Sequence, residues 1–277
     1  MKNKLIIFSK NRACQLHLLL ESIQRNAPLF FDEIVILYTA TDLYEGGYTI
    51  LRAHFPESTV SGISYVQEKH FKDDLLALLD EERFPFTTLL VDDAIFYRPV
   101  TTTKETALRA ITDDVVCFSL RLGINCTYSH PVDISYSLGE HEVVGDFLKF
   151  DYRKQMKGDF SFPLSTDGHI YRTTLLKSLL ERIEFADPNW LEFRLQTLTS
   201  GNEIPRMIAS FKESRVVSVP VNAVNIHLEH KYGMDFFISA KALNKRYVGG
   251  EVIDLTALDF SKVNGPHREI NFSYRKL

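Results

Sequence analysis

The sequence predicts an α/β protein built on a mixed, mostly parallel central sheet. Apolar runs of strand length at 5–8, 34–38, 63–66 and 89–91 alternate with three segments of helical periodicity. The run at 89–91 is continuous rather than alternating, which is typical of a strand buried on both faces. Strands that alternate with helices form parallel sheets through right-handed crossovers. We therefore expect one large domain, flanked by helices, with a C-terminal extension.

The composition is that of an ordinary globular protein. Of the 277 residues, 45% are hydrophobic and 25% are charged, and the net charge is −4. The mild negative charge and the lack of a basic stripe predict no nucleic-acid partner. No apolar run approaches about 18 residues, so no membrane span is predicted. Three cysteines without metal spacing and a start without a signal peptide indicate a cytoplasmic, reducing environment.

Two adjacent carboxylates, Asp92 and Asp93, follow the fourth predicted strand. A buried parallel strand usually opens into a ligand crevice at its carboxyl end, and carboxylates there are costly unless a cation faces them. A divalent metal that carries a phosphorylated substrate is the natural candidate. Because neighbouring strand residues point to opposite faces, we expect one carboxylate to meet the metal and the other a ribose hydroxyl or a backbone amide. The pair is equally typical of a turn that ends a strand.

Polar loops also follow the first two strands. In the loop at 9–12, Lys10 and Arg12 could reach a base or a phosphate, or could simply be solvated. The loop at 39–42 ends the second strand in the same way. No Gly-x-Gly-x-x-Gly follows the first strand and no Gly-Lys-Ser/Thr occurs, which argues against an ordinary dinucleotide or phosphate-loop enzyme.

The middle of the chain carries weaker signals. Thr102 and Glu105 form a predicted capping box for a helix through Ala110, and a fifth strand is expected at 115–120. The aromatic segment 123–163 has little periodicity. It is interpreted as a binding loop or lid over sugar rings, or as a local subdomain.

Two later carboxylates lie near the starts of predicted helices. Asp167 lies in a tight turn before a helix expected at 174–183. An Asp-Pro pair at 187–188 opens the next helix and places Glu192 in its first turns. The helix dipole would keep a carboxylate there ionised, which suits a general base, although such a charge often only complements the dipole.

The C-terminal part is expected to contain a strand at 216–219, a helix at 235–247 and a tail at 252–277 that lies across the body. His227 and His230 are close enough in sequence to meet in a turn or helix. Either could supply a nitrogen ligand to a transition metal, although a lone histidine is usually structural.

Taken in order, these motifs resemble bacterial family 2-like glycosyltransferases of the GT-A fold, a Rossmann-like fold. The residues that carry the resemblance are Ile6–Arg12, Gln15, Leu16, Leu90–Phe96, Val219–Asn222, Asn225 and His227. The match covers roughly the first 120 residues and the end of the second half. The adjacent Asp92 and Asp93 depart from the Asp-x-Asp signature of that fold.

The resemblance implies a nucleotide-sugar-binding half at 1–120, an acceptor-binding and catalytic half of the same domain at 121–235, and a C-terminal helix and tail at 236–277. It implies that the nucleotide is contacted by Ser9, Lys10, Arg12, Asp42 near the base and Asp92 near the ribose. It further implies Mn²⁺ or Mg²⁺ on Asp93, with His227 as a second candidate ligand. The base is then Glu192 as first choice and Asp167 as second.

We therefore expect a metal-dependent, hexosyltransferase-type glycosyltransferase of bacterial surface polysaccharide synthesis. The donor would be a UDP-, GDP- or CDP-sugar and the acceptor a glycan or a lipid-linked sugar, with peripheral association at the inner face of the membrane. Two alternatives stay open. One is a sugar-phosphate nucleotidyltransferase, against which the missing glycines after the first strand argue. The other is a sugar-nucleotide-binding protein on a degenerate transferase fold.

Overall fold

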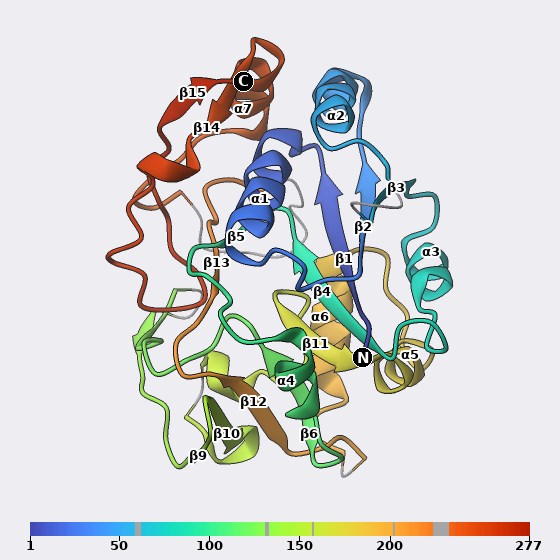
Figure 1. Cartoon of the computed structure of the whole chain (residues 1–277), viewed down its shortest axis with the longest axis vertical. Coiled ribbons are helices and arrows are strands. Elements are labelled where there is room, and N and C mark those ends of the chain that lie inside the picture. Colours follow the sequence, from blue (N-terminus) through green and yellow to red (C-terminus); the bar gives the residue numbers. More distant parts are fainter. Residues whose placement is uncertain (59–61, 131–132, 157, 202, 224–232) are drawn as a thin grey trace.

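A computed structural model describes residues 1–58, 62–130, 133–156, 158–201, 203–223 and 233–277. Its centre is a nine-stranded sheet with the order β3-β2-β1-β4-β11-β6-β12-β10-β9 (Figure 1). These strands are β1 (Asn3–Lys10), β2 (Glu33–Thr39), β3 (Ile63–Gln67), β4 (Phe86–Val91), β6 (Val115–Ser119), β9 (Glu142–Val144), β10 (Phe147–Asp151), β11 (His169–Arg172) and β12 (Met207–Phe211). The mixed sheet flanked by helices is the fold class expected from the sequence.

The first four strands pair in parallel. β1 lies between β2 and β4, and β3 lies outside β2. β11 is antiparallel to both β4 and β6, so β6 runs in the same direction as β4. The carboxyl ends of β1, β2 and β4 therefore meet at one edge of the sheet, as parallel pairing requires.

Helices cover both faces of this sheet. They are α1 (Ala13–Asn26), α2 (Asp42–His54), α3 (Phe71–Leu78), α4 (Lys104–Arg109), α5 (Thr173–Leu180), α6 (Pro188–Thr197) and α7 (Ala240–Val248), with short 3₁₀ turns at Tyr152–Lys154, Asp159–Ser161 and Leu255–Ala257. Leu5 and Ile7 of β1 enter one core, with α1, α2 and α7. Ile6 and Phe8 enter the other core, with α3, α5 and α6. Both faces of β1 are therefore buried, which accounts for its uninterrupted apolar run.

The C-terminal segment packs on the N-terminal half. α7 contacts α1 and α2, and β14 (Glu251–Ile253) pairs with β15 (Tyr274–Lys276) beside α1 (Figure 1). A separate small sheet joins β5 (Ala94–Phe96) to β13 (Val216–Ser218) and so brings a late segment beside the end of β4. None of the helices in the described ranges combines the length and the apolar character that a bilayer span needs.

Two helix predictions are wrong at their starts. α4 is capped by Thr103, whose hydroxyl accepts from the Thr106 amide, rather than by a box that begins at Thr102. The helix expected from 235 begins only after its N-cap, Ser239. The carboxylate of Glu269 accepts the amide hydrogens of residues 234–236, which holds these residues in a turn rather than a helix.

The aromatic segment 123–163 is more regular than expected. It contains the hairpin of β7 (Tyr128–Ser129) and β8 (Ile134–Ser135), and its β10 pairs with β12. Phe147 and Phe150 of β10 are buried in the two cores. Part of this segment therefore extends the main sheet, because its aromatic residues serve as core residues.

Candidate functional site

A polar cluster lies where β1 and β4 end side by side. The Ser9 hydroxyl donates to Asp92 Oδ2 over 2.9 Å, and the Lys10 amide donates to the same oxygen over 3.2 Å. Arg12 Nη1 donates to Asp92 Oδ1 over 3.1 Å. The same nitrogen donates to Asp93 Oδ2 over 3.0 Å. We call Ser9, Arg12, Asp92 and Asp93 the Arg12 cluster.

The two carboxylates of this cluster converge, whereas the alternation of a strand predicted that they would diverge. That expectation is wrong because β4 ends at Val91, and Asp92 and Asp93 form the turn to β5. Asp92 does accept from a backbone amide, that of Lys10, as expected for one member of the pair.

Burial dominates the electrostatics of the Arg12 cluster. It raises the pKa of Asp92 above its usual range, although Arg12 opposes the shift. It raises the pKa of Asp93 to about 7, where Arg12 again opposes the shift and the Asp92 and Asp167 carboxylates add to it. The Asp93 side chain is 14% exposed and that of Asp92 4%. Asp93 is therefore the more accessible carboxylate.

The loops after β1 and β2 are tied together at the same edge. Asn11 has a φ of 58°, and its amide donates to the Thr39 carbonyl. Its side-chain oxygen accepts from the Thr41 amide over 2.9 Å. Asp42 begins α2 next to this link and is exposed, as is Lys10. The structure thus places the predicted base-binding residue Asp42 on the same edge as the Arg12 cluster.

A second buried cluster adjoins the first. Arg121 Nη2 donates to Asp159 Oδ1 over 3.0 Å, and its Nη1 donates to Asp167 Oδ2 over 2.8 Å. The Ser218 hydroxyl donates to the same Asp167 oxygen over 2.7 Å, and His267 Nε2 lies 3.5 Å from it. We call Arg121, Asp159 and Asp167 the Arg121 cluster.

One oxygen of Asp167 is left over. Its Oδ1 is buried and has no hydrogen-bond partner in the described part of the chain. The turn that carries Asp167 is held by Gly168, whose amide donates to the Leu89 carbonyl of β4. Gly168 has a φ of 79°, in the left-handed region that favours glycine. Asp167 is therefore fixed beside the sheet by both its backbone and one carboxylate oxygen.

Glu192 has a different environment from the one predicted. It is the fifth residue of α6, and the first turn of α6 contains no acidic residue, so the expected dipole effect is absent. Its Oε1 accepts from the Ser165 hydroxyl over 2.6 Å and the Thr166 amide over 3.2 Å. Burial raises the pKa of Glu192, opposed by Arg121 and the Ser165 hydrogen bond, so this environment disfavours the ionised form that the sequence predicted. The N-cap at Asp187 is confirmed, since its carboxylate accepts from two amides of the first turn.

The two clusters meet through β5 and β13. Ser218 pairs with Ala94, and the Val219 amide donates to the Asp93 carbonyl over 2.9 Å. This pairing is why the Asp167 carboxylate contributes to the raised pKa of Asp93. Sequence reasoning missed Arg121, Asp159, Ser218 and His267. Their positions in the sequence carry no local signal, because long-range pairing alone brings them together.

The residues present do not fit a divalent ion between the two adjacent carboxylates. Arg12 Nη1 lies within 3.1 Å of one oxygen of each, which is the position that a shared cation would take. Within the described ranges, no three His, Cys, Asp or Glu side chains are placed to hold a metal ion. The other candidate ligands, His227 and His230, lie outside the described residues.

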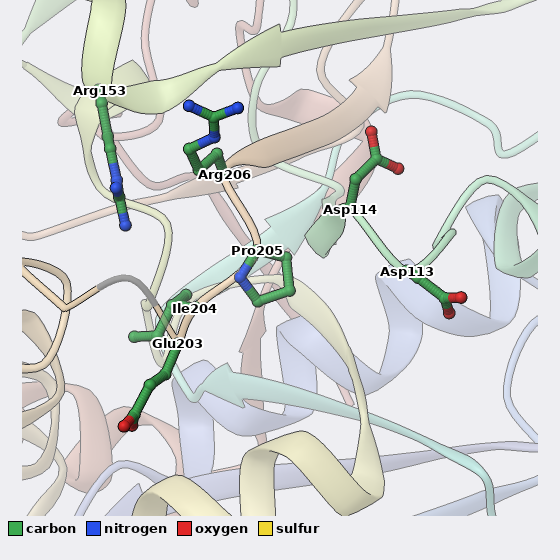
Figure 2. A pocket seen from close by; sticks show the side chains of 7 residues that line it. All are labelled: Asp113, Asp114, Arg153, Glu203, Ile204, Pro205 and Arg206. Atoms are coloured by element: carbon green, nitrogen blue, oxygen red, sulfur yellow. The ribbon is translucent and has the colours of Figure 1, made fainter.

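A cavity of about 470 Å³ lies elsewhere, beside the starts of β6 and β12. Figure 2 shows its charged side chains, including Asp113, Arg153 and Arg206, pointing in different directions rather than converging. Because β6 runs parallel to β4, this cavity is at the opposite end of the strands from the Arg12 cluster. A small crevice beside Asp93, lined by Gln15, Val219 and others, is too tight to hold a water molecule.

No family model and no curated protein sequence matches this chain. Among solved structures, residues 1–349 of S. aureus TarS in complex with UDP-GlcNAc are 17% identical, with a TM-score of 0.45, over 83% of this chain and 60% of that chain. A mannosyltransferase from Pyrobaculum calidifontis in complex with GDP-Man and Mn²⁺ is 16% identical, with a TM-score of 0.40, over 82% and 58%. A cytidylyltransferase from Leptospira borgpetersenii is 10% identical, with a TM-score of 0.44, over 78% and 77%.

This chain also spans 36% of the longer TarS structure, so its neighbours include proteins with substantial further parts. Similarities of this degree concern the path of the backbone. The substrate and the reaction depend on the side chains of the site.

Proposed function

We propose that this protein is a glycosyltransferase that moves a sugar from a nucleotide-sugar donor to a hydroxyl of a glycan or lipid-linked acceptor. The observation that carries the proposal is the Arg12 cluster, which gathers polar and charged groups at the carboxyl ends of β1 and β4. In open α/β sheets, ligands bind at this edge. The sequence resemblance to GT-A glycosyltransferases adds the reaction class.

The donor site is assigned to the loops at this edge. Lys10 and Arg12 supply positive charge for the diphosphate, and α1 begins directly after them with no acidic residue in its first turn. A helix N-terminus of this kind favours a phosphate. Ser9 and Asp92 face the ribose side, and Asp42 is closest to the base. That Asp93 and His227 are metal ligands stays a prediction from the sequence.

Asp167 is our choice for the base that takes the acceptor proton. In the reaction, the acceptor oxygen forms a bond to the anomeric carbon. The bond between that carbon and the phosphate oxygen breaks, and its electron pair leaves with the nucleoside diphosphate. Asp167 is held through one oxygen by Arg121 and Ser218, which leaves Oδ1 without a partner in the described ranges. Glu192 instead supports the turn that carries Asp167. A positioned base of this kind typically contributes about 10²–10⁴ in rate.

A second candidate is a sugar-nucleotide-binding protein that performs no transfer. The burial of Asp167 favours it, because an acceptor hydroxyl has to reach the base. A place in bacterial surface polysaccharide synthesis, at the cytoplasmic face of the membrane, follows from the sequence resemblance. The three free, buried cysteines suit that compartment.

The proposal is tested by titrating the protein with UDP-, GDP- and CDP-sugars in a calorimeter, with and without Mn²⁺, and by assaying release of the nucleoside diphosphate. We expect one nucleotide class to bind, and Asp92→Asn to weaken its binding. Asp146→Asn, at an exposed turn, is the matched control. A folded protein that binds no nucleotide under either condition would contradict the proposal. Binding without any sugar transfer would favour the second candidate.

A further inference from the structure

We infer that Arg12 occupies the place of a divalent metal ion in this site, so that nucleoside diphosphate binding needs no metal. The identity of the ligand rests on the proposed function. The statement about the cation rests only on the geometry of the Arg12 cluster and is tested separately.

The first observation is that Arg12 contacts both carboxylates with one nitrogen. Its Nη1 lies 3.1 Å from Asp92 Oδ1 and 3.0 Å from Asp93 Oδ2. Hydrogen bonds between a guanidinium and a carboxylate are charge-assisted and among the strong ones in proteins. A metal ion on the same two oxygens would have to displace this nitrogen.

The second observation is that Arg12 is built into the fold. Its Nη2 donates to the Asn222 carbonyl, and its backbone amide donates to the Tyr48 hydroxyl over 3.3 Å. The side chain is 10% exposed, and its position is the N-cap of α1. Displacing it would leave a permanent positive charge buried without its partners, which is strongly unfavourable.

The third observation concerns the groups that remain for a diphosphate. Arg12 Nε is buried and has no partner among the described residues, so one donor of the guanidinium is unpaired. Lys10 is exposed two residues before it, and α1 begins one residue after it. These positive groups come from one loop. They supply the countercharge that a metal ion supplies in sites built only from carboxylates.

The experiment compares binding of Mn²⁺ alone, without nucleotide, to the wild-type protein and to Arg12→Ala. Free Mn²⁺ is measured by its electron paramagnetic resonance signal, and folding is checked by circular dichroism. The wild type is expected to bind little Mn²⁺. Arg12→Ala exposes the two carboxylates to the ion. Its affinity for Mn²⁺ is expected to exceed that of the wild type by about tenfold or more, since a positive charge has been removed. Arg12→Lys keeps the charge and should bind little.

The double variant Arg12→Ala with Asp93→Asn locates the ion, because the gain should disappear when Asp93 loses its charge. Nucleotide titrations of the wild type in EDTA and in Mn²⁺ should give the same affinity. The inference is overturned if the wild type binds Mn²⁺ as tightly as Arg12→Ala, or if nucleotide binds only in Mn²⁺. If no nucleotide binds in either buffer, the proposed function fails, while the Mn²⁺ comparison still decides the inference.

Discussion

Two buried arginines each hold a pair of aspartates, and they hold them differently. Arg121 uses separate nitrogens for carboxylates that come from distant segments, and all three side chains are 5–8% exposed. Arg12 uses one nitrogen for two adjacent carboxylates, and its Asp93 is 14% exposed. The Arg121 cluster is closed and cross-links the fold, whereas in the Arg12 cluster both carboxylates share one arginine nitrogen and Asp93 is partly exposed.

The difference separates a cluster whose carboxylates are bonded to different nitrogens from one whose carboxylates share a nitrogen. Removing one partner of a buried ion pair strongly destabilises the protein, because the other charge stays buried without its partner. Asp93, which shares its donor, is the more exposed carboxylate of the Arg12 cluster. The closed cluster still has two buried atoms without a partner in the described part of the chain, Asp167 Oδ1 and Arg121 Nε.

The largest effect is expected from Asp167→Asn, which tests whether the closed cluster also contributes to the chemistry. The amide accepts no proton, so the rate of sugar transfer should fall about 10²–10⁴-fold. Nucleotide affinity, measured by calorimetry, should be unchanged because the Arg12 cluster is intact.

The matched control is Glu192→Gln, which keeps an oxygen to accept from Ser165. Its rate should fall by less than about tenfold, because one neutral hydrogen bond replaces a charge-assisted one. Loss of transfer in Glu192→Gln but not in Asp167→Asn would return the role of base to Glu192.

The second effect is on stability and compares the two arginines directly. Arg121→Ala leaves Asp159 and Asp167 buried without their cation, which should lower the free energy of unfolding by about 3–5 kcal/mol. Arg12→Ala should cost less, about 1–3 kcal/mol, because the Ser9 and Lys10 hydrogen bonds to Asp92 remain. Urea denaturation measures both. An equal or larger loss in Arg12→Ala would remove the distinction between the clusters.

The third prediction is that Asp93 of the Arg12 cluster and His169, a buried residue of β11, respond to pH in opposite senses. Burial raises the pKa of Asp93 from 3.8 to about 7, so its contribution to stability is present below 3.8 and lost as the pH rises through 7. Burial, with Arg121, lowers the pKa of His169 from 6.5 to about 3, so its contribution is present above 6.5 and lost as the pH falls toward 3.

Denaturation at a series of pH values measures these trends. Relative to the wild type, Asp93→Asn should become more stable as the pH rises through neutrality. His169→Gln should lose less stability on acidification. Parallel pH profiles for the wild type and both variants would show that neither group titrates as its burial implies.

The smallest effect is expected away from both clusters, at the cap of α6. Asp187→Ala removes the acceptor of the Asn189 and Trp190 amides and should cost about 1 kcal/mol. Asp187→Asn, which keeps an acceptor, should cost less. Nucleotide binding should be unchanged in both, and a large loss of binding would show that α6 acts on the donor site.

Much of the Arg12 cluster was predictable, because it depends on local order. Strands that are connected by helices pair in parallel, so the polar residues that follow successive strands lie at the same edge of the sheet. Ser9, Arg12 and Asp92 were placed there from their positions alone, and the structure brings them into contact. The convergence of Asp93 on Arg12 was not predictable, because it depends on where the strand ends and the turn begins.

The Arg121 cluster lay beyond sequence reasoning. Arg121 follows β6, Asp159 lies in a 3₁₀ turn and Ser218 ends β13, and nothing in their spacing links them. The predictions of where α4 and α7 begin were wrong for a related reason. Several threonines compete for one cap, and a distant carboxylate, Glu269, holds the backbone before α7.

The order of the first strands and helices, the two buried faces of β4 and the polar edge of the sheet follow from hydrophobic periodicity, which is a property of neighbouring residues. Which cation faces Asp92 and Asp93, and which later carboxylate keeps a free oxygen, was decided only by tertiary structure. Those choices depend on hydrogen bonds between segments up to 210 residues apart, such as that from Arg12 to Asn222. Burial strengthens such bonds and penalises every charge left without one.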